Sequence, residues 1–84
     1  MGRGTKSRSR WEIILDILER TSEEEGKAKK TRIMQKACLD WRSFKKYFDF
    51  LLEHGFIVGD NSYKLTEKGE DLLRRLREVD DILR

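Results

Sequence analysis

The sequence predicts a mainly α-helical fold with a small β-hairpin, and three observations support this prediction. Apolar residues recur with helical spacing in two adjacent segments, 31–37 and 40–54. Two short runs, 56–58 and 63–65, flank a Gly-Asp-Asn-Ser sequence that suits a hairpin turn. One more helical period follows in residues 66–84. This order of elements is that of a winged helix-turn-helix followed by a C-terminal dimerisation helix.

The 84 residues divide into three predicted parts. Residues 1–8 are rich in Gly, Ser and Arg and form a flexible basic arm. Residues 9–65 form the winged helix-turn-helix, and residues 66–84 form the C-terminal helix. A domain of this size buries only about 60 to 65% of its unfolded surface, so we expect it to gain burial by association.

The composition indicates a cytoplasmic protein without a membrane partner. The single cysteine, Cys38, cannot form an internal disulfide, and no apolar run approaches the roughly 18 residues of a membrane span. The basic N-terminus lacks the apolar core of a signal peptide. We therefore expect a reducing, intracellular location.

Positive charge is concentrated in the two adjacent helical segments. Residues 27–46 contain eight basic residues and one acid, Asp40, for a net charge of +7 in a chain whose total is +3. Residues 1–10 add four bases and no acid. Such a concentration is typical of a surface that contacts phosphates, so we expect double-stranded DNA as the partner. The alternative is a charged surface that is merely solvated.

The first helix is expected to begin at Ser9, because Ser9 and Glu12 have the spacing of a capping box. Its inward face consists of Trp11, Ile14, Leu15 and Leu18. The segment 21–26 ends the helix, and we expect the glutamates at 23–25 to form a solvated loop.

Two further helices are expected in the +7 region. Thr31 is the candidate N-cap of the second helix, and Asp40 is that of the third, which Gly55 ends. The inward face of the second helix consists of Ile33, Met34 and Ala37. That of the third consists of Trp41, Phe44, Tyr47, Phe48, Leu51 and Leu52. Phe50 points away from this face, and Cys38, beside the turn, is expected to be a buried small residue.

The cations of the third helix are placed against the helix dipole. Arg42, Lys45 and Lys46 lie in its first turns, whereas Asp49 and Glu53 lie in its last turns. Each such placement costs a few tenths of a kcal/mol up to about 1 kcal/mol, so helix stability does not explain it. DNA recognition does, because recognition helices present their N-terminal residues to the major groove.

Other candidate DNA contacts lie outside the third helix. Arg32 and Lys36 occupy the outer face of the second helix. Arg8 and Arg10 lie at the end of the basic arm, whose composition suits contact with phosphates or a minor groove. The hairpin is a short wing with an acidic tip and one base, Lys64, so we expect little contact from it.

The final helix is expected to start after Thr66 and to provide a dimerisation seam. Leu72, Leu76, Val79 and Leu83 are separated by four, three and four residues, which is the spacing of apolar residues in a heptad repeat. Leu73 and Ile82 flank the seam and are candidates for packing on the helix's own domain. Packing of the whole helix on its own domain is the alternative.

Several runs of the chain are similar to a known family. They are Thr31-Arg-Ile-Met, Ala37-Cys-Leu, Tyr47-Phe48, Leu51, Gly55-Phe-Ile and Tyr63-Lys-Leu-Thr-Glu-Lys-Gly69. They resemble the small archaeal winged-helix DNA-binding proteins that dimerise through a long C-terminal helix in an antiparallel coiled coil. The resemblance implies a nucleoid-associated homodimer that acts as a transcriptional regulator or chromosome-associated protein. By position, it assigns DNA contact to Arg42, Ser43, Lys45 and Lys46.

Enzymatic chemistry and cofactor binding find little support in the sequence. His54 is the only histidine and is expected at a helix end, and one histidine with one cysteine cannot supply a zinc site. A different class remains open, a winged helix that binds a partner subunit of a larger complex. The weak wing and the outward Phe50 favour this alternative.

Overall fold

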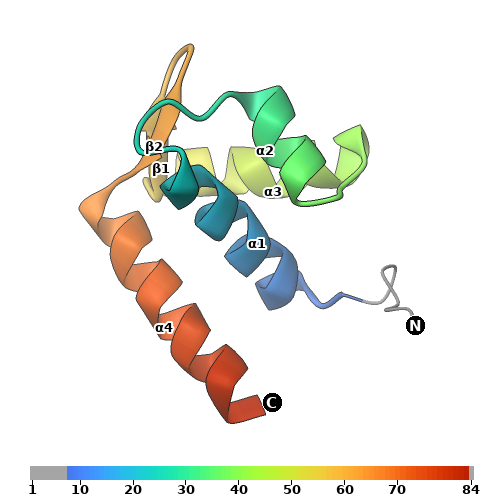
Figure 1. The fold of residues 1–84 in the computed structure, drawn as a ribbon, viewed down its shortest axis with the longest axis vertical. Coiled ribbons are helices and arrows are strands. Elements are labelled where there is room, and N and C mark those ends of the chain that lie inside the picture. The colour runs from blue at the N-terminus through green and yellow to red at the C-terminus, as the bar shows by residue number, and fades with distance from the viewer. Residues whose placement is uncertain (1–7, 84) are drawn as a thin grey trace.

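The computed structural model describes residues 8–83 and confirms the predicted fold (Figure 1). The elements, in order, are α1 (Arg10–Glu23), α2 (Lys30–Lys36), α3 (Trp41–Glu53), β1 (Ile57–Gly59), β2 (Tyr63–Leu65) and α4 (Glu67–Leu83). Most of the predicted basic arm lies outside the described residues. Within them, no helix is long and apolar enough to cross a membrane.

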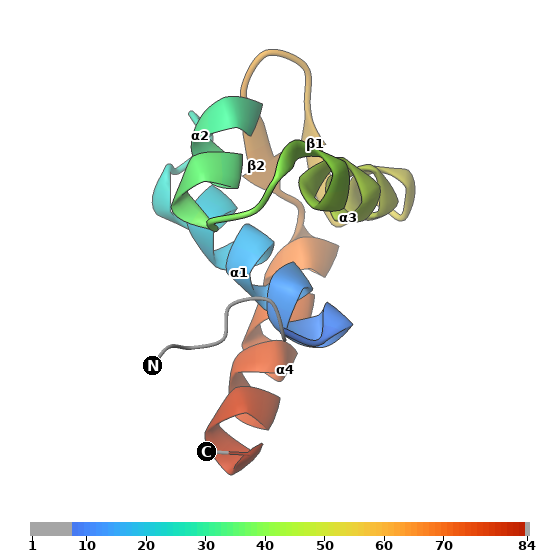
Figure 2. The same cartoon turned by 90° about the vertical axis from the view of Figure 1, so that its right-hand side faces the viewer.

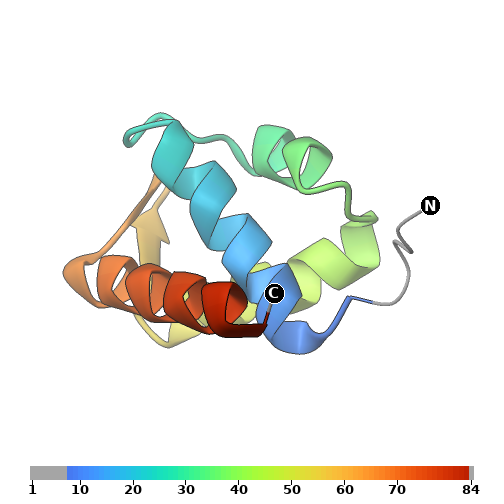
Figure 3. The same ribbon diagram turned by 60° about the horizontal axis from the view of Figure 1, so that its bottom comes forward.

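The core lies around α1, which contacts α2, α3, α4 and β2. Figure 3 shows α1 running between α4 and α2. Ile17 and Leu18 of α1 are fully buried, and Ile33 of α2 and Phe44 and Phe48 of α3 are fully buried with them. The helix-turn-helix and the terminal helix therefore pack on the same central helix.

The start of α1 has the capping interaction that the sequence predicts. The Ser9 backbone N–H donates to a Glu12 carboxylate oxygen at 2.8 Å, and the Ser9 hydroxyl donates to the same oxygen at 3.0 Å. These two hydrogen bonds hold the pKa of Glu12 below its ordinary value. At the other end, the buried Thr21 hydroxyl donates to the Ile17 carbonyl at 2.8 Å.

The start of α2 differs from the prediction. The N-cap is Lys29, not Thr31, and its carbonyl accepts from the Ile33 N–H at 3.0 Å. The reason is the preceding strand-like bridge between Ala28 and Tyr63, which leaves the chain extended until Lys29. The helix then begins at once, earlier than side-chain capping preferences indicate.

The turn between α2 and α3 corrects the prediction for Cys38. Cys38 is exposed and not buried, and its backbone has a positive φ of 56°. Because this left-handed conformation lies at the tight turn, the side chain points out of the core. Asp40 is the N-cap of α3 and Gly55, with a φ of 77°, follows its end, as the sequence predicts.

The inward face of α3 forms an aromatic core, with one exception. The Phe44 and Phe48 rings stack at 4.8 Å, and Phe48 meets Tyr63 of β2 edge-on at 5.0 Å. Trp41, which was predicted to lie inward, is 52% exposed because it occupies the first helical position, at the edge of the domain. Phe50 is 39% exposed, in agreement with its predicted outward position.

The hairpin pairs β1 and β2 antiparallel, with Ile57 opposite Leu65 and Gly59 opposite Tyr63. Gly59 therefore belongs to the strand, and the loop holds three residues, 60–62, where the sequence predicts four. The Tyr63 N–H also donates to the Ala28 carbonyl at 2.8 Å. This bond ties the base of the wing to the segment that leads into α2.

The start of α4 is fixed against the end of α3. The Thr66 hydroxyl accepts from the Gly69 N–H at 3.0 Å and lies 2.6 Å from the Gly55 carbonyl, to which it donates. The ammonium of Lys68 donates to the His54 carbonyl at 2.8 Å. A side-chain carbon at Gly69 would overlap the Phe56 carbonyl, so the glycine permits this close approach.

Candidate nucleic-acid interface

The first turns of α3 carry three exposed cations, Arg42, Lys45 and Lys46. Lys45 forms an ion pair with Asp49 one turn later at 2.8 Å. The ammonium of Lys46 lies 5.5 Å from the centre of the Tyr47 ring. Within residues 8–83, Arg42 forms no ion pair, so its guanidinium faces solvent with its five donors available.

Ser43, the fourth predicted contact on α3, lies beside Asp40 at the start of the helix. The nearby Ser43 hydroxyl and, to a lesser extent, its backbone N–H hold the pKa of Asp40 below its ordinary value, and the Arg42 charge adds to the effect. Asp40 is therefore an anion at neutral pH at the N-terminus of α3, where the helix dipole favours it. The half-buried Ser43 is already used in this local structure.

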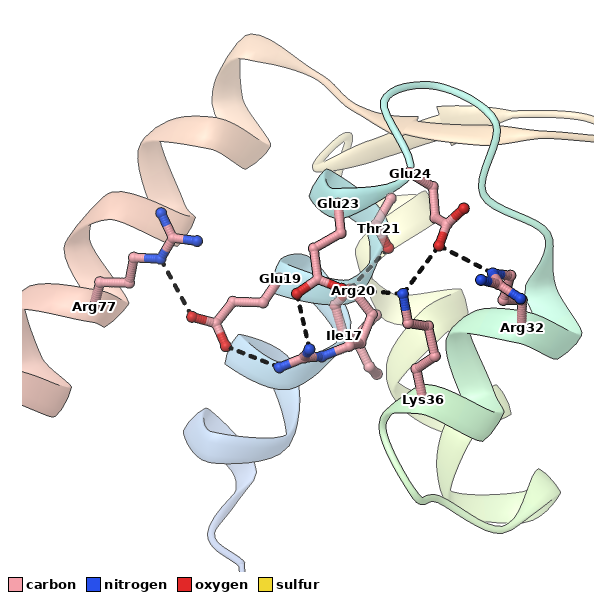
Figure 4. A network of polar contacts seen from close by, with 9 residues as sticks. All are labelled: Ile17, Glu19, Arg20, Thr21, Glu23, Glu24, Arg32, Lys36 and Arg77. Atoms are coloured by element: carbon pink, nitrogen blue, oxygen red, sulfur yellow. Dashed lines mark hydrogen bonds and ion pairs between the residues drawn. The ribbon is translucent and has the colours of Figure 1, made fainter.

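The two candidate residues of α2 are engaged by the acidic end of α1 (Figure 4). The Glu24 carboxylate accepts from Arg32 Nε at 3.0 Å and from Lys36 Nζ at 3.1 Å. Glu23 adds a second contact to Lys36 at 3.2 Å. These hydrogen bonds lower the pKa of Glu24 and raise that of Lys36. The expectation of a merely solvated loop is wrong for Glu23 and Glu24.

Arg8 and Arg10 occupy different environments. The Arg8 guanidinium bonds to the Asp16 carboxylate, to the Ala37 carbonyl at 3.0 Å and to the Cys38 carbonyl at 3.2 Å. Arg8 therefore links α1 to the turn of the helix-turn-helix. Arg10 is exposed at the first position of α1.

Three lysines at the start of α2 belong to the same charged region, although the sequence does not distinguish them as DNA contacts. Lys27 and Lys29 are exposed on the segment that leads into α2, and the ammonium of Lys30 lies 5.7 Å from the centre of the Phe48 ring. The sequence indicates them only through their contribution to the net charge of +7 in residues 27–46. Their position depends on the Ala28 bridge, which no local pattern indicates.

The predicted dimerisation residues are divided between the core and the surface. Leu72 and Leu76 are partly buried against the core, beside the buried Leu73. Val79 and Leu83 are exposed on the last turns of α4. Ile82, a candidate for packing on its own domain, is instead 79% exposed, because α4 extends beyond α1 at this end (Figures 1 and 2).

Helices α2 and α3 lie together with the wing at one end of the molecule, and the last turns of α4 lie at the other (Figures 1 and 2). This arrangement, with two helices joined by a short turn and followed by a hairpin, defines a winged helix-turn-helix. A family model described as "Winged helix-turn-helix" matches residues 7–84. The chain belongs to this family.

Two relatives come from one archaeon. An uncharacterised protein of Methanocaldococcus jannaschii is 46% identical over 77 residues, which are 90% of this chain and 77% of the relative. A second uncharacterised protein of the same organism is 46% identical over 68 residues, and the chain spans only 31% of its length.

Two solved structures share the fold. One is Sso10a-2, a DNA-binding protein from Sulfolobus solfataricus, with 30% identity, a TM-score of 0.77 and coverage of 89% of this chain and 81% of that one. The other is a protein of unknown function from Listeria innocua, with 22% identity, a TM-score of 0.70 and coverage of 83% and 52%. The predicted resemblance to small archaeal winged-helix DNA-binding proteins is confirmed.

Proposed function

We propose that this protein binds double-stranded DNA as a homodimer, with α3 as the recognition helix. The exposed cations on the first turns of α3, Arg42, Lys45 and Lys46, carry the proposal. Their placement opposes the helix dipole, and among the described residues the only ion pair that they form is the exposed Lys45–Asp49 pair, whereas phosphates and guanine edges would be favourable partners. The description of Sso10a-2 as a DNA-binding protein supports the same role.

The salt dependence of duplex binding tests this function. Each neutralised phosphate contributes a slope of about −0.9 to a plot of log K against log salt, so five contacts give about −4 to −5. Titration of a labelled duplex at two or more salt concentrations measures the slope. Affinity that is independent of salt, or no binding at low salt, would contradict the proposal.

Regulation and chromosome association make different demands on sequence discrimination. A regulator binds its site typically 10³- to 10⁷-fold more tightly than unrelated DNA, whereas a chromosome-associated protein binds most duplexes alike. Competition between genomic fragments and a random duplex at one fixed salt concentration separates these roles. The exposed lysines of α3 and the exposed Lys27 and Lys29 favour contact with phosphates, and hence the chromosome-associated role.

The proposed dimer forms through α4. Val79, Ile82 and Leu83 are exposed apolar residues on its last turns, and they continue the half-buried Leu72 and Leu76. We infer an antiparallel pair from the family resemblance. A parallel pair would gain from contact between Arg75 and Asp80 of two chains, but Arg75 already pairs with Asp71 of its own helix at 2.8 Å. The exchange of one exposed ion pair for another changes little.

A second function is favoured by one specific surface feature. The exposed Phe50 and His54 form an aromatic cluster with the half-buried Phe56; the centres of the Phe50 and His54 rings are 4.3 Å apart, and the Lys68 ammonium lies 4.8 Å from the centre of the Phe56 ring. Aromatic clusters of this kind are typical of protein interfaces. If duplex titration shows no binding, Phe50→Ala in a pull-down with candidate partner subunits is the next test.

A further inference from the structure

Glu24 binds both residues of α2 that the sequence predicts to contact DNA, Arg32 and Lys36. Its carboxylate lies between Arg32 and Lys36, which are one helical turn apart, and both contacts, at 3.0 and 3.1 Å, are within hydrogen-bond distance (Figure 4). The Glu24 side chain is 19% exposed, whereas that of Arg32 is 60% exposed. The anion is thus the more enclosed partner, and the cations remain reachable from solvent.

The backbone fixes Glu24 in this position. It is the C-cap of α1, and its N–H bonds to the Ser22 and Thr21 carbonyls. Its own carbonyl accepts from the Lys27 N–H at 3.0 Å, which closes the turn before α2. These bonds fix the backbone of Glu24 beside α2, and the hydrogen bonds from Arg32 and Lys36 hold its carboxylate there.

A carboxylate that accepts from a guanidinium and an ammonium makes the same contacts that a DNA phosphate would make. We propose that Glu24 occupies the phosphate-binding groups of α2 and competes with the DNA backbone for them. This inference rests on the proposed DNA-binding function. A duplex that reaches α2 must displace Glu24, so Glu24 lowers the affinity that Arg32 and Lys36 would otherwise provide.

The exchange is feasible because exposed ion pairs are weak, whereas phosphate contacts also release counterions. The effect on affinity is correspondingly moderate. It applies to every DNA sequence alike, since phosphate contacts carry no sequence information. Glu24 then reduces binding to bulk DNA without altering the contacts that α3 makes with base edges.

Neutralisation of Glu24, by the Glu24→Gln substitution, tests the proposal. We expect Glu24→Gln to bind a labelled random duplex about three to ten times more tightly than the wild type at low salt. Glu25→Gln is the matched control, because Glu25 is an adjacent exposed glutamate that loses the same charge but forms no ion pair with α2 among the described residues. Equal gains for both variants would overturn the proposal, since they would reflect net charge alone. A loss of affinity for Glu24→Gln would overturn it as well, by showing that Glu24 positions the cations for DNA.

A double-mutant comparison examines the same inference through Arg32. In the wild type, Arg32→Ala removes a side chain that is already engaged, so its effect on affinity is expected to be less than about threefold. In the Glu24→Gln background the same substitution is expected to cost several-fold more. Equal effects of Arg32→Ala in the two backgrounds would overturn the proposal. Thermal melts of each variant show that the fold is retained.

These outcomes distinguish failure of the inference from failure of the function. If the wild type and both glutamate variants all fail to bind duplex DNA at low salt, the proposed function is wrong and the inference falls with it. If the wild type binds and the two glutamate variants behave alike, the function stands and only the competition by Glu24 is wrong.

Discussion

Arg42 and Lys46 are the α3 cations that have no ion pair with the described residues. We expect Arg42→Ala and Lys46→Ala each to weaken duplex binding, by about 1 to 3 kcal/mol where a base contact is lost. The thermal midpoint should stay nearly unchanged, because both side chains are exposed. Fluorescence anisotropy with a labelled duplex and a thermal melt measure the two effects.

Lys64 on the wing provides the control for these substitutions. It is exposed on β2, opposite Val58, and lies on a hairpin with an acidic tip residue, Asp60. Lys64→Ala should reduce affinity less than either α3 substitution. If Lys64→Ala reduced the affinity for duplex DNA more than either Arg42→Ala or Lys46→Ala, the wing and not α3 would be the main DNA-contacting element.

Stability at acid pH depends on several carboxyl groups whose pKa values are lowered in the folded protein. These are Glu12, Glu24, Asp40 and Asp71. A carboxyl group whose pKa is lower in the folded state stabilises the protein when the pH is above the group's ordinary pKa, which is 4.5 for glutamate. This contribution is lost as the pH falls through the pKa of the folded state. Lys36 has a raised pKa, so its contribution is present below 10.5 and is lost as the pH rises through the folded value.

We therefore expect the contributions of these groups to stability to be constant between pH 4.5 and 10.5. The thermal midpoint should decrease when the pH is lowered below 4.5. Glu12→Gln should lower the midpoint at neutral pH and reduce the fall at acid pH, because it removes one group that titrates there. Melts from pH 2 to pH 7 measure both. An unchanged acid profile in Glu12→Gln would show that the capping carboxylate contributes nothing to stability.

The contact between α4 and the α3–β1 connection depends on Gly69. Gly69→Ala should destabilise the domain by about 1 to 3 kcal/mol, because the added methyl group overlaps the Phe56 backbone carbonyl and not a movable side chain. Chemical denaturation measures the change. Glu70→Ala, at the adjacent exposed position of the same helix, is the control and should change stability by less than about 0.5 kcal/mol. Equal effects of the two substitutions would show that α4 can move away from Phe56 at no cost.

The elements themselves could be predicted because their signals are local. The Ser9 capping box, the Asp40 N-cap, Gly55 and the Thr66 cap each act within a few residues, and all are found in the structure. The start of α2 could not be predicted, because it is set by the bridge from Ala28 to Tyr63, which is distant in sequence.

The electrostatic state of the candidate site could be predicted less well than its position. The sequence places Arg32 and Lys36 on an outer face, and they are exposed or half-buried there. Their partner, Glu24, comes from another helix, and so do the Asp16 and Ala37 partners of Arg8. Charge counts along the chain do not reveal ion pairs that form only in the tertiary structure.

The proposed dimer should be sensitive to a charge introduced on the last turns of α4. Val79→Asp should yield monomers in sedimentation equilibrium at tens of micromolar and should weaken duplex binding, because a buried charge would disrupt the apolar seam. Val79 is a better target than Leu76, which also packs on its own core. Val58→Asp, the same change at a similarly exposed valine on the wing, should leave the oligomeric state unaltered. A wild-type monomer at these concentrations would contradict the dimer.

The anchoring of α4 on α3 has a consequence for the length of DNA that the proposed dimer recognises. The carbonyls of His54, Gly55 and Phe56 all lie against the start of α4. The end of α3 is therefore held directly against α4. Each subunit then carries its recognition helix at a set angle to the two-fold axis. Paired half-sites that differ in spacing by about 5 base pairs, half a turn of the duplex, would present opposite faces of the DNA to one of the two subunits. The dimer should respond to this helical phase, and not merely to the number of phosphates within reach.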